Sequence, residues 1–236
     1  GRIYRELGDA LSGMVESFSF TSLAEKILST EGGAAVQTLS DAGRAVLVRR
    51  ALEELQDNVH YYHRHRRSAA FCQMAAQTID ELKSAGLSGQ QLAQLAGACG
   101  AESGKLSELA LIFQGYETLL ARSGMDPSDR LELAGARLEE ALARHSLPEF
   151  LRDRAVFIDE FDTFNAPKKR LLGAMLAALP SVTVALCDDG APLLPGDLSL
   201  FSGAKQVAAQ LRQLARKNGA EVAVPQLLRK DLSLIH

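Results

Sequence analysis

Residues 155–162 of this 236-residue chain read Ala155-Val156-Phe157-Ile158-Asp159-Glu160-Phe161-Asp162. Four apolar residues in succession predict a short β-strand inside a sheet. Acidic side chains follow it directly, so we expect them at the carboxyl edge of that sheet, where ligands bind in open α/β folds. Because so short a pattern also occurs by chance, an ordinary strand end with solvated acidic residues remains an alternative interpretation.

The pattern is typical of a Walker B strand in enzymes that use nucleoside triphosphates. In that interpretation, Asp159 reaches a Mg²⁺ that bridges the phosphates, usually through a water molecule. Glu160 orients or deprotonates the attacking water.

A second acidic strand end follows the first along the chain. Residues 182–186 form another apolar run, and Cys187, Asp188 and Asp189 come directly after it. A predicted helix over 166–179 separates the two runs, which favours parallel strands whose carboxyl ends share one edge. The two acidic segments then form a cation or phosphate site; alternatively, Asp188 and Asp189 only cap the following loop.

The whole pattern predicts an α/β fold, a partial parallel sheet with an all-helical insertion. A helix over about 204–218 and a third strand over 221–224 complete a sheet that we expect to be covered on both faces. Residues 41–150 show only helical periodicity. Before them come a strand candidate at 14–18 and a helix that Ser22 and Glu25 would begin as a capping box. The predicted regions are therefore 1–40, 41–150 and 151–236.

One basic, aromatic stretch lies in the helical block: His60-Tyr61-Tyr62-His63-Arg64-His65-Arg66-Arg67. Such a cluster can contact phosphates and stack bases, so Tyr61, Tyr62, Arg64, Arg66 and Arg67 are candidate nucleic-acid residues. The alternative is a solvated helix end whose tyrosines pack. His60 and His63 have a spacing that metals use, but no second ligand cluster supports a metal site.

The segment nearest to a phosphate-binding loop is Gly100-Ala101-Glu102-Ser103-Gly104-Lys105. A working loop follows a strand and has Ser or Thr after the lysine, whereas this segment lies between predicted helices and continues with Leu106. It is interpreted as a helix–helix linker. We therefore expect this chain alone not to hydrolyse ATP.

Composition and cysteine content exclude several classes of protein. The apolar fraction of 47% is ordinary for a globular protein. The net charge is −3, so the chain has no overall positive charge of the kind that indicates nucleic-acid binding. Three widely spaced cysteines without a CxxC pair indicate reduced thiols in a cytoplasmic protein, not a zinc site or a disulfide framework. No apolar run is long enough to cross a membrane. The chain starts at Gly1 and stops at His236, and we expect both ends to be internal to a longer protein.

Residues 156–164 resemble motif II of superfamily 1 helicases, an apolar strand followed by Asp-Glu-Phe-Gln-Asp-Thr. Glu160, Phe161 and Thr163 match, and Asp162 stands where Gln is typical. Three further segments resemble, in the same order, the AddB family of bacterial helicase–nuclease subunits. They are Ser17–Ala24 ("SF-x-x-LA"), Phe71–Leu87 ("ELK-x-x-G" at its end) and Lys105–Glu117 with Asp126 and Asp129 ("KL-x-DLALIY-x-x-YE … D-x-x-D"). The resemblance covers about residues 14–225.

The resemblance implies a fold and a task. Residues 1–40 and 151–236 would belong to the first RecA-like domain, and 41–150 to its helical insertion. It implies ATP and Mg²⁺ as cofactors, with Glu160 catalytic, Asp159 holding the metal, and Asp188 and Asp189 beside the nucleotide. It also implies an AddA-type partner, double-stranded DNA ends and single-stranded DNA as substrates, and a role in Chi recognition. A C-terminal nuclease domain with an iron–sulfur cluster would lie outside these residues.

Two alternatives remain open at this point. Asp159-Glu160 stands where AddB proteins usually have Asp-Gly, which also fits an ATP-dependent helicase of the UvrD kind. Against that, residues 187–192 lack the Gln expected after the second strand. The other alternative is a non-catalytic scaffold, in which the helical block docks on a partner and the acidic residues have lost their role.

Overall fold

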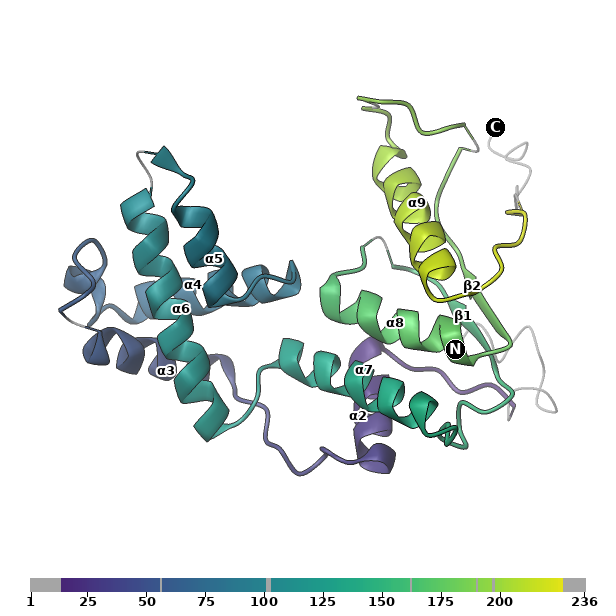
Figure 1. Cartoon of the computed structure of the whole chain (residues 1–236), viewed down its shortest axis with the longest axis horizontal. Coiled ribbons are helices and arrows are strands. Elements are labelled where there is room, and N and C mark those ends of the chain that lie inside the picture. Colours follow the sequence, from purple (N-terminus) through teal and green to yellow (C-terminus); the bar gives the residue numbers. More distant parts are fainter. Residues whose placement is uncertain are drawn as a thin grey trace, which may run out of the picture.

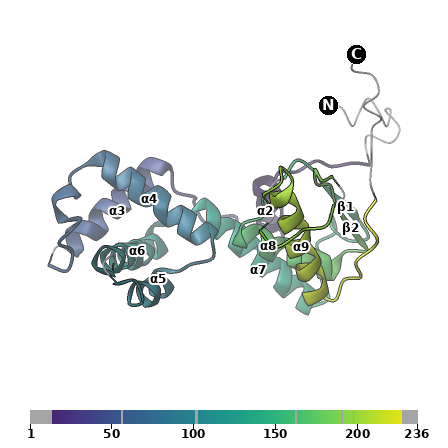
Figure 2. The same ribbon diagram turned by 90° about the horizontal axis from the view of Figure 1, so that it is seen from above.

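The computed structural model describes residues 14–55, 57–100, 103–161, 163–189, 191–196 and 198–226. Asp162 of the motif quoted first lies outside these residues. The described chain forms two lobes that lie side by side in both views (Figures 1 and 2).

The helical lobe contains four helices and a 3-10 turn over His63–His65. The helices are α3 (Asp41–Glu54), α4 (Ala69–Ser84), α5 (Gly89–Ala96) and α6 (Ser103–Ser123). Ser40, Ser68 and Ser88 cap the first, second and third of these, because each side-chain oxygen accepts the backbone N–H three residues later. Their apolar faces meet in one core, whose fully buried members include Val48, Leu52, Ile79, Ile112, Phe113 and Tyr116.

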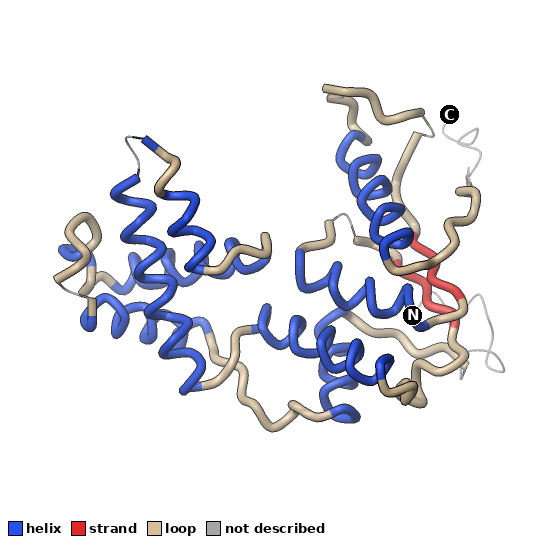
Figure 3. Tube along the Cα trace, viewed as in Figure 1, coloured by secondary structure: helices blue, strands red, loops and turns tan. Residues whose placement is uncertain are grey.

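The α/β lobe contains both strands of the described chain, β1 (Ala155–Ile158) and β2 (Ser181–Val184), as Figure 3 shows. Its helices are α2 (Phe20–Glu31), α7 (Pro127–Ala143), α8 (Ala166–Ala178) and α9 (Ser202–Lys217). A second core joins α2, α7, α8 and β1, and its fully buried members include Ile27, Leu28, Leu138, Leu171, Leu172 and Met175. The predicted mixture of helices and a parallel sheet is confirmed at this level.

β1 and β2 pair in parallel, as predicted, with Ala155 opposite Ser181 and Ile158 opposite Val184. The ladder continues one step further, since Ala185 N donates to Ile158 O at 2.9 Å. The expected coverage of both faces is wrong for the described residues. Ile158 is buried in the second core, whereas Phe157 points the other way and is 76% exposed.

Two predicted strands are not strands in the structure. Residues 14–18 are irregular and pair with neither strand of the described sheet; Phe18 packs on Phe150, with ring centroids 6.4 Å apart. Residues 221–224 are also irregular, and Val224 is exposed. The capping box of α2 also differs from the prediction: Ser19 is the cap residue, and Ser22 completes the box.

The predicted helical block, 41–150, divides between the two cores. α3 to α6 build the first core, whereas Ala134 and Leu138 of α7 belong to the second. The chain therefore crosses between the lobes through two segments, 32–40 and 124–126. These crossing segments lie against each other: Leu39 N donates to Met125 O at 2.9 Å, and Met125 N donates to Gln37 O at 3.0 Å. The division into regions stays a proposal, with its second boundary best moved to about residue 124.

Candidate functional site

The acidic strand ends lie at one edge of the sheet. Asp159 and Glu160 directly follow β1, and Asp188 and Asp189 lie four and five residues beyond the end of β2. Because the strands run in parallel and in register, both acidic segments leave the sheet at its carboxyl edge. We call these four residues the acidic edge.

The turn after β1 holds Asp159 and Glu160 in the solvent. Glu160 has φ of 63°, a left-handed conformation that is uncommon for residues other than glycine. Its backbone N–H donates to Asp159 Oδ1 at 2.9 Å, which ties the two residues into a tight local turn. Both side chains are exposed. The pair is therefore accessible to a ligand from solvent.

An aromatic cluster anchors this turn on its inner side. The ring of Phe161 meets Phe20 edge-on, with centroids 4.9 Å apart, and Phe164 lies 6.2 Å from Phe161. Lys168 of α8 places its ammonium 5.3 Å from the Phe161 centroid and 5.5 Å from that of Phe20. The segment after β1 is thereby fastened to both α2 and α8.

Asp189 is engaged by α9. Its Oδ1 accepts from Lys205 Nζ at 2.9 Å and from Ala191 N at 2.9 Å, and Lys205 is only 5% exposed. The hydrogen bond from Lys205, followed by that from Ala191, lowers the pKa of the Asp189 carboxyl. A buried lysine bound to Asp189 fixes the loop after β2 on α9, so this contact supports the capping alternative for that residue.

The acidic edge fits a metal only in a limited way. Over the part of the chain that the structure describes, no three His, Cys, Asp or Glu side chains gather into a set that could hold a metal ion. Magnesium on a nucleotide takes most of its ligands from phosphates and water and needs as little as one protein carboxylate nearby. The exposed Asp159 side chain satisfies that requirement, but it could not retain Mg²⁺ without phosphates.

The basic, aromatic stretch forms a loop between α3 and α4, at the end of the helical lobe away from the sheet (Figure 1). Glu108 of α6 lies buried beneath it and accepts three consecutive backbone N–H groups, those of His60, Tyr61 and Tyr62, at 2.7–3.2 Å. A carboxylate that accepts several backbone N–H groups makes strong, charge-assisted hydrogen bonds. Glu108 therefore fixes the loop backbone, a role that no sequence pattern indicated.

The aromatic side chains of this loop line an open pocket of about 450 Å³. Tyr62 and His65 each stack on Phe71, with ring centroids 5.4 Å apart and planes 28° apart. We call the pocket the aromatic groove; it is lined by Tyr61, Tyr62, His65, Ala70, Phe71, Met74 and Lys105.

The arginines of the loop divide into two groups. Arg64 and Arg67 are exposed, but the Arg66 guanidinium lies against the His63 ring, 3.1 Å from Nδ1. A cation in contact with the His63 ring also opposes metal binding at the His60–His63 pair. Of the segment nearest to a phosphate-binding loop, Ser103, Gly104 and Lys105 belong to α6 and not to a linker. A Cβ at Gly104 would lie 3.0 Å from Tyr61 Cε2, so Gly104 supports the groove.

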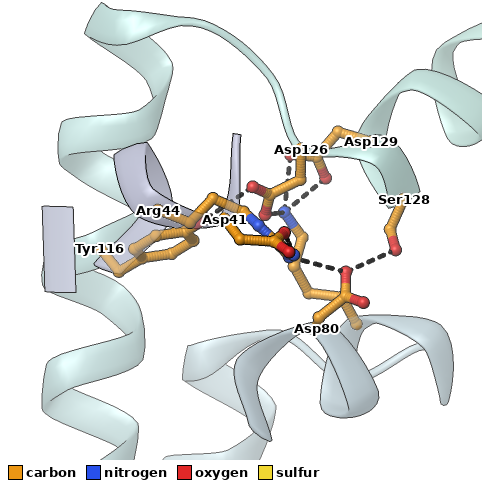
Figure 4. A network of polar contacts seen from close by, with 8 residues as sticks. Asp41, Arg44, Asp80, Tyr116, Asp126, Ser128 and Asp129 are labelled. Carbon is orange, nitrogen blue, oxygen red and sulfur yellow. Dashed lines mark hydrogen bonds and ion pairs between the residues drawn. The ribbon is translucent and has the colours of Figure 1, made fainter. Parts of the chain in front are cut away.

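A buried polar network joins the two lobes (Figure 4). At its centre, Asp126 is fully buried and accepts from Tyr116 Oη at 2.5 Å and from Lys83 Nζ at 2.9 Å. Lys83 also donates to Asp129 at 2.6 Å. Burial and the hydrogen bond to Asp126 raise the pKa of the Tyr116 hydroxyl. Tyr116 and Lys83 belong to the helical lobe, and Asp126 and Asp129 to the start of α7.

The outer part of this network adds a second link between the lobes. Ser128 Oγ of α7 donates to Asp80 Oδ1 of α4 at 2.9 Å, and Arg44 Nη1 of α3 lies 3.4 Å from the same oxygen. Arg44 also donates to Asp41 at 2.7 Å. We call the eight residues the inter-lobe network: Asp41, Arg44, Asp80, Lys83, Tyr116, Asp126, Ser128 and Asp129.

The inter-lobe network explains residues that carry the family resemblance without belonging to any predicted site. Asp80 and Lys83 come from the "ELK-x-x-G" segment, and Tyr116, Asp126 and Asp129 from the "YE … D-x-x-D" segment. Asp126 occupies the cap position of α7, but its side chain makes no capping hydrogen bond. Its carboxylate holds Tyr116 and Lys83 instead.

Known proteins resemble this chain over nearly its whole length. The sequence profile of the family described as "ADDB, N-terminal" matches residues 2–233. B-type subunits of ATP-dependent helicase/deoxyribonucleases are similar to it in Desulforudis audaxviator, with 33% identity over 93% of this chain, and in Moorella thermoacetica, with 31% identity over 93%. One from Anoxybacillus flavithermus is 28% identical over 99% of the chain. The chain spans only about a fifth of these relatives' own length, 19–20%.

Two further expectations concern thiols and membranes. Cys72, Cys99 and Cys187 are all free thiols, and only Cys72 is buried. Among the described helices, none combines the length and the apolar character that crossing a bilayer requires.

Proposed function

The chain belongs to the AddB N-terminal family, and we propose that it forms part of an ATP-dependent helicase/deoxyribonuclease. This is the activity that the names of its relatives describe. In this proposal the enzyme acts in the bacterial cytoplasm on double-stranded DNA ends and single-stranded DNA, with an AddA-type partner subunit. Its task is the processing of double-strand breaks before recombination. The iron–sulfur cluster that the resemblance implies would lie outside these 236 residues.

The observation that carries the proposal is the parallel pairing of β1 and β2, which directs both acidic segments to one edge. Nucleotide-binding α/β folds use this edge. We propose that the two strands belong to a larger RecA-like sheet. The exposed, apolar side chain of Phe157 fits this proposal, because in a larger sheet that is covered on both faces another part of the longer protein would cover it.

We assign different tasks to the two residues after β1. Asp159 would help to hold a Mg²⁺, which would supply positive charge beside the nucleotide phosphates. Glu160 orients or deprotonates the water that attacks the terminal phosphate. Asp188 lies beside the nucleotide, whereas Asp189, bound by Lys205, positions the loop that follows β2.

The test measures DNA-stimulated ATP hydrolysis by the longer subunit that carries this chain. Its partner should have an inactivated ATP site, because a second motor would mask the signal. We expect Glu160→Gln and Asp159→Ala each to lower turnover at least about 100-fold, the usual effect of losing a positioned proton acceptor or metal residue. Glu149→Gln, which changes another exposed glutamate of the same lobe, should keep wild-type turnover.

The same experiment separates the alternatives. Turnover that is unchanged in both variants, or already absent in the wild-type subunit, would contradict the proposal and favour the non-catalytic scaffold. The chain alone should hydrolyse no ATP, since no phosphate-binding loop occurs in its sequence. The comparisons favour the AddB family over a helicase of the UvrD kind.

A further inference from the structure

We propose that the aromatic groove of the helical lobe binds one unpaired base of single-stranded DNA, while Arg64 and Arg67 contact the neighbouring phosphates. This inference rests on the proposed function for its ligand class, but not on the acidic edge. The loop between α3 and α4 lies at one end of the molecule and the strands β1 and β2 lie toward the other, as Figures 1 and 2 both show. The two sites can therefore be disabled separately.

The shape of the groove suits a flat ring. The groove is a shallow, open pocket of about 450 Å³, so a flat ring could enter it from solvent. Phe71, with Tyr62 and His65 stacked on it, supplies a rigid aromatic wall. Tyr61 is 54% exposed and Met74 is also largely exposed, so aromatic and thioether surface remains available to a ligand. Every base has a π face, so such a site accepts bases without selecting sequence.

The charge around the groove suits a nucleic-acid backbone. Between Asp57 and Asp80 the sequence contains three arginines and three histidines and no acidic residue, although the whole chain has a net charge of −3. Lys105 lines the groove, and Arg64 and Arg67 are exposed on the same loop. This local excess of positive charge fits phosphates on both sides of a bound base.

The loop is also held in place before any ligand arrives. The Glu108 carboxylate fixes three successive backbone N–H groups, and Gly104 allows the Tyr61 ring to lie against α6. A site that is already ordered loses less conformational entropy on binding than a mobile loop does. The groove is therefore already ordered before a ligand binds.

The experiment compares two labelled probes by fluorescence anisotropy: a short oligothymidylate and an abasic oligonucleotide of the same length. We expect Tyr61→Ala to weaken oligothymidylate binding by the chain at least about fivefold, the lower end of the effect of losing one aromatic–base stack. Tyr61→Phe, which keeps the ring, should stay within about twofold of wild type. The abasic probe, which keeps the phosphates, should bind wild type and Tyr61→Ala equally.

Two matched controls separate the groove from general effects. Leu95→Ala removes an exposed apolar side chain of α5 in the same lobe, and Arg50→Ala removes an exposed arginine of α3; neither should change affinity. Arg64→Ala should weaken both probes about equally and lower the salt dependence of binding. A Tyr61→Trp variant gives the chain, which has no tryptophan, a single reporter that a stacked base would quench.

Three results would overturn the inference: no binding of oligothymidylate by the wild-type chain at low salt, wild-type affinity in Tyr61→Ala, or an equal loss for both probes in that variant. An unchanged urea midpoint for Tyr61→Ala ensures that a loss reflects the groove. Failure here would leave the ATP hydrolysis test untouched, because that test depends on Glu160 and Asp159. Conversely, a negative ATP hydrolysis result would not alter the expected ratio between the two probes.

Discussion

At the scale of single residues, Lys83 of the helical lobe neutralises the carboxylates of Asp126 and Asp129 at the start of α7. Its ammonium is largely buried and donates to both Asp126 and Asp129. Burial alone would lower the pKa of Lys83, but the hydrogen bonds and charges of the two carboxylates outweigh burial and raise it. Lys83 therefore remains charged in the folded protein at neutral pH, and its ammonium balances the charge of the buried Asp126.

Replacing Lys83 with methionine should lower the free energy of unfolding at neutral pH by about 3–5 kcal/mol, because Asp126 would be left buried without its partner. The folded state binds the Lys83 proton more tightly than the unfolded state does. The contribution of Lys83 is therefore complete below pH 10.5 and is lost as pH rises through the raised pKa. Urea denaturation at neutral pH and above pH 10.5 measures both effects.

The exposed Lys217→Met variant serves as the control for this measurement and should change stability by no more than about 0.5 kcal/mol. An alkaline loss of stability as steep in Lys83→Met as in wild type would contradict the assignment. Tyr116 titrates in the same direction, since its raised pKa also favours the protonated form in the folded state. A shallower loss, not a flat profile, is therefore the expected result for Lys83→Met.

Individual side chains differ in how far the sequence could place them. Asp159 and Glu160 were predictable because a run of four apolar residues ends directly before them, and strand ends meet at one edge. Glu108 was not, because the three N–H groups that it accepts lie 46–48 residues earlier. The contacts of Tyr116 and Lys83 with Asp126 were not predictable either, because they arise from tertiary packing and not from a local sequence pattern.

At the scale of secondary structure, the helices were more predictable than the strands. The helices α3 to α7 all lie within residues 41–150, where the sequence shows helical periodicity, because the buried face of an amphipathic helix appears as a regular spacing of apolar residues. A strand requires a neighbour as well as a pattern. Neither residues 14–18 nor residues 221–224 have a ladder partner in the described sheet, so neither segment forms a strand.

The open face of the sheet leads to a prediction for β1. Phe157→Ser should change the free energy of unfolding of this chain by no more than about 0.5 kcal/mol, because the side chain is already in solvent. Ile158→Ala, one residue later and on the buried face, should cost about 2–5 kcal/mol. Thermal or urea unfolding of the two variants measures both changes in the free energy of unfolding. Similar losses in both would mean that the Phe157 face is covered.

At the scale of the whole molecule, the described residues form two cores and not one. Every buried member of the first core lies within residues 47–120, and no member of the second core does. No sequence pattern marks the boundary near residue 124, because α7 has the same helical periodicity as its neighbours. Only its packing on α2 and α8 assigns it to the α/β lobe. Arg130 of α7 strengthens that assignment by donating to Val36 O in the first crossing segment at 2.6 Å.

Because the two crossing segments lie side by side, we expect that the helical lobe can be deleted and replaced by a short linker. Thr38 and Met125 form a parallel bridge, so a replacement linker between residues 39 and 124 must double back across a few ångströms. About six glycine and serine residues have that reach. The shortened protein should unfold in one cooperative urea transition, with Asp126 and Asp129 hydrated at the positive end of α7. A product that binds hydrophobic dyes and unfolds gradually would mean that the α/β lobe needs its neighbour to fold.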